Sequence, residues 1–344
     1  MLVTVFEDRP DGFAGVQLAV ASLVRHLPGV RISVIRPGLT GGEHRWLAER
    51  PGVRVTDRSF AARGWDVKPT VLLAALELAD DVVWWDADLL AVGDLRRVLP
   101  DRAPDALVAT EETYWGQEQG TGQRGRAWGL APGRRLPTTV NTALLRVGQR
   151  HRPLLTAWQH LLGDQRYRSA QATAADRRPL HLLGDQEVLT ALLESRPFAA
   201  EPLLLLRRGV GIAQCFGPAG FTVGERVRAA SRREVPPIVH AMGAKPWYLL
   251  PWPHGGRPPR TAHPAAWRDF YERLHAQLSP YTVAAAAYRG DLSSPAWLDS
   301  RSAWASAVRL GSGGSPVLDE LPLALLDSVV RRVRRRLGVG RFGL

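Results

Sequence analysis

Short hydrophobic runs alternate with stretches of helical periodicity over the first part of the chain. Residues 2 to 6 form an apolar run that predicts a strand, and apolar residues recur every three or four positions over 16 to 27, which predicts a helix. Strand-like runs return at 30 to 36, at 53 to 55 and at 81 to 85. Because strands and helices alternate, we predict an α/β fold with a mainly parallel central sheet and helices on both faces.

The middle of the chain has a less regular pattern. Residues 115 to 137 are rich in Gly, Arg and Gln without a clear period, and we interpret them as a long loop. Residues 140 to 148 then predict a strand, and 151 to 162 and 184 to 195 predict helices. Residues 251 to 265 are dense in Pro, Gly and His, which indicates an irregular segment.

These patterns predict four parts. Residues 1–250 form the main domain, 251–310 an extension that packs on it, 311–316 a Gly-Ser linker and 317–344 a basic amphipathic helix. The helix has two interpretations that the sequence leaves open. It could lie on an anionic membrane surface, or it could dock on the protein body or on a second copy.

The composition narrows the class of protein. The formal charge of +12 favours acidic or phosphate-bearing partners, but no nucleic-acid-binding module is recognisable. A single cysteine, Cys215, excludes an internal disulfide and fits a reducing compartment. The chain has neither a leader pattern nor an apolar run of about 18 residues, so we expect a cytoplasmic protein, with a peripheral position at the inner membrane face left open.

The strongest chemical signal is the segment WWDADLL. A buried strand ends on Asp86, and Asp88 follows two residues later. Ligands of such sheets bind beyond the carboxyl ends of the strands. A hard divalent cation prefers oxygen ligands, and a bound diphosphate can supply the remaining ones. We therefore predict a metal site at this strand end.

A second signal is the segment IVHAMGAKPW. His240 follows a strand-like pair of residues, and a glycine turn leads to Lys245 and Trp247. A histidine is a suitable third ligand for a cation held by carboxylates, and a lysine ammonium binds phosphate as a compact charge. Of the 45 basic residues only Lys68 and Lys245 are lysines, which favours a role for Lys245 over an ordinary surface position.

Four segments, in the order WWDADLLAVGDL, VNTALLRVG, LLGDQEVLTALL and HAMGAKPW, resemble the motifs of the family 8 glycosyltransferases, the group of glycogenin and the bacterial lipopolysaccharide galactosyltransferases. The resemblance covers roughly residues 1 to 250. It implies a GT-A fold, a UDP-sugar donor, Mn²⁺ or Mg²⁺ as the cation, and transfer of a hexose with retention of anomeric configuration. The acceptor would be a sugar, a lipid-linked molecule or another small molecule.

The resemblance also implies roles for single residues. The assignments, by role, are these: metal ligands Asp86, Asp88 and His240; donor binding by Lys245, Lys68, Ala87, Glu7 and Trp247; sugar-site or catalytic residues Asp185, Gln186 and Asn141. For Asp185 the simpler alternative is a cap of the helix that follows it. For Glu7 the alternative is a solvated residue at a strand end.

Two other functions compete with sugar transfer. A haloacid dehalogenase-type phosphatase also places an Asp-x-Asp pair after an apolar strand, but there the motif opens the domain, and here several strands and helices come before Asp86. A non-catalytic nucleotide-sugar-binding protein would keep the same motifs without turnover.

Overall fold

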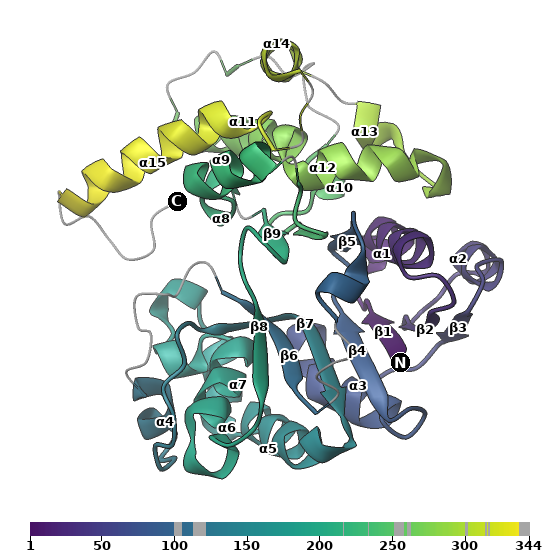
Figure 1. Cartoon of the computed structure of the whole chain (residues 1–344), viewed down its shortest axis with the longest axis vertical. Coiled ribbons are helices and arrows are strands. Elements are labelled where there is room, and N and C mark those ends of the chain that lie inside the picture. Colours follow the sequence, from purple (N-terminus) through teal and green to yellow (C-terminus); the bar gives the residue numbers. More distant parts are fainter. Residues whose placement is uncertain are drawn as a thin grey trace. The chain divides into compact units, whose positions relative to one another are not determined.

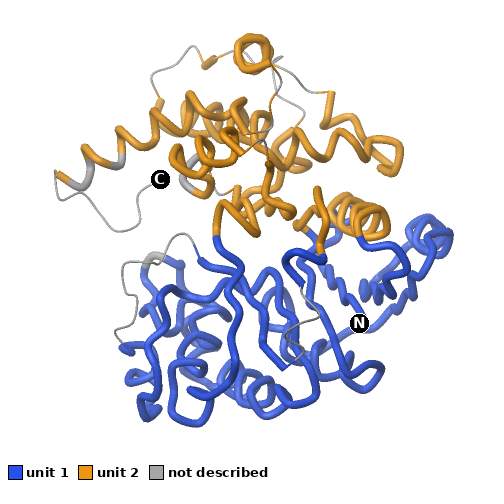
Figure 2. Tube along the Cα trace, in the orientation of Figure 1, with its two compact units in different colours: residues 1–13, 27–87, 96–207 blue, residues 14–26, 88–95, 208–344 orange. Residues whose placement is uncertain are grey.

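The computed structural model describes residues 1–99, 105–112, 122–215, 217–232, 234–250, 258–259, 263–299, 302–313, 315 and 317–336. The chain divides into two compact units, and it passes between them several times (Figure 2). Unit 1 consists of Met1–Phe13, Leu27–Ala87 and Arg96–Arg207, and unit 2 consists of Ala14–His26, Asp88–Leu95 and Arg208–Leu344. A boundary therefore falls between Ala87 and Asp88, inside the Asp-Ala-Asp segment.

Unit 1 is built on a seven-stranded sheet of order β3-β2-β1-β4-β7-β6-β8 (Figure 1). Its strands are β1 (Leu2–Phe6), β2 (Arg31–Ile35), β3 (Val53–Thr56), β4 (Asp81–Trp85), β6 (Leu107–Glu111), β7 (Val140–Gly148) and β8 (Leu203–Leu206). β7 runs antiparallel to both of its neighbours, whereas the other pairs are parallel. The predicted α/β class with a mainly parallel central sheet is thus confirmed.

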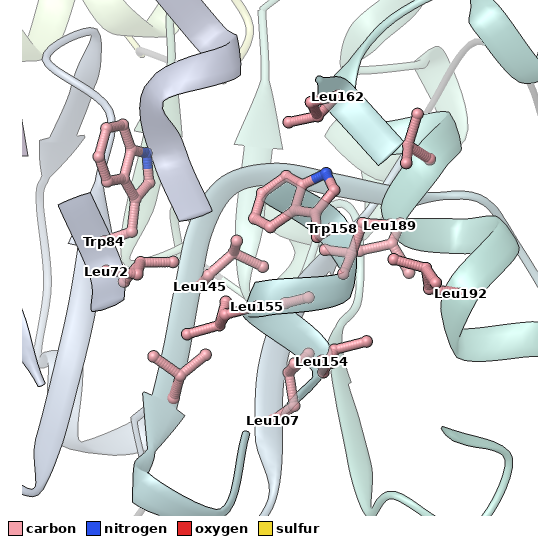
Figure 3. Close-up of a cluster of buried hydrophobic side chains, with 14 of the residues drawn as sticks. Leu72, Trp84, Leu107, Leu145, Leu154, Leu155, Trp158, Leu162, Leu189 and Leu192 are labelled. Carbon is pink, nitrogen blue, oxygen red and sulfur yellow. The ribbon is translucent and has the colours of Figure 1, made fainter. Parts of the chain in front are cut away.

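Helices flank this sheet, and their apolar side chains pack against it to form the core of unit 1. They are α2 (Gly41–Ala48), α3 (Lys68–Ala75), α4 (Gln123–Ala127), α5 (Arg152–Leu162), α6 (Gln165–Gln171) and α7 (Asp185–Glu194). Leucines of α3, α5 and α7 pack with the tryptophans at 84 and 158 against β4, β6 and β7 (Figure 3). All residues of β1 and most of β7 are buried, so both sheet faces are covered, as expected for a central strand with a continuous apolar sequence.

Unit 2 contains a smaller, three-stranded sheet of order β5-β10-β9. The strands are β5 (Leu89–Ala91), β9 (Ile212–Gln214) and β10 (Ile238–His240). Its helices are α1 (Phe13–His26, of which Phe13 belongs to unit 1), α8 (Gly217–Gly220), α9 (Val223–Arg232), α10 (Pro246–Leu249), α11 (Pro264–Leu278), α12 (Pro280–Ala285), α13 (Ala296–Asp299), α14 (Ala303–Ser312) and α15 (Leu321–Arg336). An apolar cluster from α1, β5, β9, β10 and α12 forms the core of this unit.

Two sequence-based interpretations need correction or completion. Residues 115–121 of the predicted long loop lie outside the described residues, but 123–127 form α4, and Arg124 is buried and donates a hydrogen bond to Thr139. A five-residue helix is too short to produce a visible period, so the sequence pattern missed it. Among the described residues, no helix combines the length and the apolar character that a membrane span requires.

Candidate functional site

In unit 1, Asp86 lies directly beyond the buried strand β4. Its backbone N–H donates to the carbonyl of Ala143 at 2.9 Å, which continues the ladder between β4 and β7 by one residue. Its carboxylate accepts a hydrogen bond from the Trp84 indole at 2.5 Å and another from the Lys68 ammonium at 3.2 Å. The side chain of Asp86 is about one quarter exposed (24%), so these contacts orient a carboxylate that solvent and a ligand can still reach.

Lys68 stands between two carboxylates at the start of α3. Its ammonium lies 3.2 Å from Oδ2 of Asp86 and 3.7 Å from Oδ2 of Asp185. The carbonyl and hydroxyl oxygens of Thr142 accept from it at 3.1 and 3.0 Å. The Thr142 hydroxyl in turn donates to Asp185 at 2.6 Å. Because Lys68 is buried, its charge acts on these two acids with little screening by solvent.

Asp185 is the first residue of α7 and does not cap that helix. The N-cap position is held by Gly184, and the Asp185 carboxylate points to Thr142 and Lys68 on other elements. Its backbone carbonyl accepts a hydrogen bond from the Trp158 indole at 3.0 Å. The capping alternative is therefore wrong, and Asp185 belongs to the polar cluster at the end of β4.

Asn141 connects this cluster to a second group of polar residues. Its amide nitrogen donates to Oε2 of Glu112 at 2.8 Å and approaches Oε1 of Gln186 at 3.4 Å. Its amide oxygen accepts from the Thr110 hydroxyl at 3.1 Å. The predicted sugar-site residues Asn141, Asp185 and Gln186 thus lie together in unit 1.

Glu187 follows Gln186 on α7 and is fully buried, which raises the pKa of its carboxyl from 4.5 to about 8. A raised folded-state pKa means that the folded chain keeps a proton which the unfolded chain releases. The free energy of unfolding is therefore expected to fall as pH rises from about 4.5 to about 8.

Glu187→Gln removes this pH-dependent contribution to the free energy of unfolding. We expect the variant and the parent chain to have the same free energy of unfolding near pH 4.5. Between pH 4.5 and 8 the variant should become progressively more stable than the parent chain, by at most about 1.4 kcal/mol per pH unit. Urea denaturation across this range checks the prediction, and a difference that does not change with pH would contradict it.

In unit 2, strand pairing brings Asp88 and His240 together. β10 pairs antiparallel with β5, with His240 opposite Leu89, and the N–H of Ala241 donates to the carbonyl of Asp88 at 3.0 Å. Nε2 of His240 lies 3.4 Å from Oδ1 of Asp88, and both side chains are buried. Two residues about 150 positions apart in the sequence are therefore adjacent through the register of two short strands.

The turn after β10 brings Lys245 next to Asp88. Gly243 has φ +72°, a conformation that favours glycine, and Lys245 follows as the N-cap residue of α10. The Lys245 ammonium donates to the carbonyl of Ala241 at 2.7 Å and forms a close ion pair with Oδ2 of Asp88. Burial alone would raise the pKa of Asp88, but the charges of Lys245 and His240 outweigh burial and hold that pKa well below its usual range.

Asp86, Asp88 and His240 together are a candidate metal-ligand group. The contact between Asp88 and His240 lies within unit 2, and Asp86 is separated from Asp88 only by Ala87 along the chain. Oδ1 of Asp88 is buried, and no described group donates a hydrogen bond to it. Two ligands about 2.1 Å from a cation can stand at the 3.4 Å that separates this oxygen from Nε2 of His240. The donor set of two carboxylates and one imidazole fits a divalent cation.

Three other residues that the sequence assigned to donor binding are held by protein groups. Both carboxylate oxygens of Glu7 accept hydrogen bonds from Arg9, and its side chain is buried. Trp247 packs its ring against Tyr281 and Trp297 in unit 2. Ala87, between the two aspartates, is buried. Their donor-binding roles stay predictions.

Sequence reasoning missed Thr142 and Glu112. Thr142 belongs to the same VNTALL segment as Asn141, and residues one apart at a strand end can both contact groups at that edge. Glu112 follows β6 directly, so the rule that pointed to Asp86 could also have pointed to Glu112. Glu112 was overlooked because Glu111 and Glu112 stand together before a Gly- and Gln-rich stretch, and this pattern is typical of a solvated loop.

Comparison with known proteins gives structural neighbours only. No family model matches the chain, and no curated protein matches its sequence. The structure is similar to that of the galactosyltransferase LgtC in complex with donor and acceptor sugar analogs, with 17% identity over 85% of this chain and 100% of that chain and a TM-score of 0.45. It is similar to the bifunctional glycosyltransferase WbbM, with 12% identity over 72% of this chain and a TM-score of 0.47, and it spans 46% of that chain. The glycosyltransferase GlyE of Streptococcus pneumoniae TIGR4 has 15% identity over 84% of this chain and 63% of that chain, with a TM-score of 0.42.

Proposed function

We propose that this chain is a GT-A glycosyltransferase that transfers a hexose from a UDP-sugar to a hydroxyl acceptor with the help of a divalent cation. The observation that carries the proposal is the placement of His240 and Lys245 against Asp88, two residues after Asp86 at the end of a central strand. This combination of carboxylates, imidazole and ammonium suits a cation and a diphosphate better than it suits a neutral ligand.

Asp86, Asp88 and His240 would hold the cation, for which Mn²⁺ and Mg²⁺ are both candidates. When bound, the cation would neutralise charge on the departing diphosphate. Lys245 supplies a second positive charge at the same place, and we assign it to a phosphate oxygen of the donor. Lys68 is buried between Asp86 and Asp185, and we propose that it acts on the donor site by orienting these two carboxylates.

The sugar of the donor is assigned to the polar cluster in unit 1. Asn141 and Gln186 present amide groups next to Asp185, and such groups form hydrogen bonds with sugar hydroxyls. In the proposed reaction the bond between C1 of the sugar and the diphosphate oxygen breaks. A bond from C1 to the acceptor oxygen forms on the same face, and the acceptor proton leaves with the diphosphate or to water. Asp185 is held by Thr142 and Lys68, so it is better placed to orient Lys68 and the sugar than to attack C1.

The donor class is tested by a screen for hydrolysis. Purified chain is incubated with a panel of UDP-hexoses, with GDP-mannose as an unrelated donor, and with added Mn²⁺ or Mg²⁺. We expect release of UDP from at least one UDP-hexose, and we expect loss of this activity when EDTA removes the cation. Restoration of activity by added Mn²⁺ or Mg²⁺ after EDTA treatment is the control for damage to the protein.

The same preparation separates the competing functions. Turnover of a generic phosphate ester without turnover of any UDP-sugar would favour the phosphatase. Saturable, metal-dependent binding of UDP with no turnover of any donor, even with a panel of sugar and lipid-linked acceptors, would favour the non-catalytic binding protein. Either result would contradict sugar transfer.

A further inference from the structure

Helix α15 presents an apolar stripe that no described residue of unit 2 covers. Five aliphatic side chains on it are between 38% and 60% exposed, and they are Leu325, Leu326, Val329, Val330 and Val333. Their spacing places all five within one side of the helix, because positions three and four residues apart adjoin on its surface. In the rest of the described chain, the exposed large apolar residues are separated from one another along the sequence, which is ordinary for a protein surface, whereas a continuous stripe indicates a partner.

Arginines continue the same surface toward the end of the helix. Arg332 and Arg336 are exposed, and they extend the row that Leu325 and Val329 begin, at spacings of four, seven and eleven residues. The sequence of α15 contains three further arginines, and Asp327 is its single acidic residue. The long arginine stem can lie along an apolar surface while the guanidinium contacts anions.

The N-terminal end of α15 is anchored to unit 2 by buried polar contacts. Glu320, just before the helix, is fully buried and forms an ion pair with Arg226 of α9, and His275 of α11 also contacts it. Arg226 donates to the carbonyl of Val317 at 2.9 Å as well. Ala324 on the opposite side is buried, and the helix packs against α8 and α9 (Figure 1). The exposed stripe is therefore held in a fixed orientation on unit 2.

We propose that this face of α15 binds the surface of an anionic lipid bilayer. An aliphatic stripe needs an apolar medium, and the arginines beside it need anions; a bilayer interface with acidic headgroups supplies both. A second copy of the chain fits less well, because pairing the stripe with itself would cover the aliphatic side chains but would offer Arg332 and Arg336 only Asp327 as an anion on the partner helix. Nucleic acid would satisfy the arginines but would leave the aliphatic side chains without a partner.

Vesicle co-sedimentation of the full chain tests this proposal. We expect binding to vesicles of phosphatidylcholine with phosphatidylglycerol, weak binding to pure phosphatidylcholine, and partial release at high salt. Arg332→Glu with Arg336→Glu, and separately Leu326→Asp with Val330→Asp, are each expected to lower the partition coefficient by about tenfold or more. Leu310→Asp on α14 is the matched control, because Leu310 is 87% exposed and lies outside the stripe.

Several outcomes would overturn the proposal. They are absence of vesicle binding, equal binding to neutral and anionic vesicles, and unchanged binding of both double variants. A dimer of the parent chain that Leu326→Asp with Val330→Asp converts to monomer would assign the face to a second copy instead. The inference does not depend on the proposed sugar transfer, since the readout is sedimentation and the variants lie outside that site. Unchanged donor hydrolysis and circular dichroism serve as controls for folding.

Discussion

Replacing Asp88 with alanine is expected to reduce metal-dependent turnover of the UDP-sugar donor by about a thousandfold or more. Asp88 contacts both His240 and Lys245, so its loss removes one metal ligand and the group that positions the other two side chains. The measurement is the initial rate of UDP release at saturating Mn²⁺, together with titration of Mn²⁺ binding in the absence of donor. We expect metal affinity and rate to fall together.

Loss of Asp88 also leaves the Lys245 ammonium buried without its ion-pair partner, which can destabilise the fold. Asp86→Asn separates the two effects, because it leaves the pair of Asp88 and Lys245 intact, and the buried Lys68, which loses the charge of Asp86, keeps its contacts with Asp185 and Thr142. Asp299→Asn, which breaks an exposed pair with Arg289, is the control for removal of an acid elsewhere. If Asp86→Asn and Asp88→Ala both fold and still turn over the donor with metal dependence, the proposed metal site is wrong.

The sequence predicts those parts of this site that follow an uninterrupted apolar run or that have a distinctive side-chain chemistry. The run DVVWW could be recognised as a buried strand because its last four residues are apolar without interruption, and Asp86 follows them directly. The predicted adjacency of Asp88 and His240 is confirmed by the pairing of β5 with β10. That prediction came from the chemistry of the side chains, since nothing in either segment states which strand pairs with which.

The parts that could not be predicted depend on short or long-range features. β5, β9 and β10 each contain three residues, which is too few for a period of two to be recognised. The antiparallel direction of β7 is set by its neighbours on the sheet and not by its own apolar sequence. The contact of Lys68 with Thr142 joins residues 74 positions apart, so no local sequence pattern could show that Lys68 also lies beside Asp86 and Asp185.

This placement makes Lys68 the second residue whose loss should have a large effect. Lys68→Met removes the buried charge that faces Asp86 and Asp185, and breaking a buried ion pair from one side costs about 3 to 5 kcal/mol of unfolding free energy. We expect the lower end of that range, because Asp86 is partly exposed and Asp185 keeps its hydrogen bond from Thr142. Urea denaturation measures the loss. The exposed pair of Arg152 with Glu77 supplies the control, since Arg152→Met should cost less than about 1 kcal/mol.

A double variant distinguishes the charge of Lys68 from its bulk. If Asp185 is destabilising without a cation beside it, Lys68→Met combined with Asp185→Asn should be more stable than the sum of the two single losses predicts. Additive losses would mean that the two side chains act independently.

Steady-state kinetics of the Lys68→Met variant distinguishes two roles for Lys68, donor binding and orientation of the two acids. A donor-binding lysine raises the KM for the UDP-sugar, whereas a lysine that orients Asp86 and Asp185 lowers kcat with little change in KM. The contacts of Lys68 with both acids lead us to expect the second result.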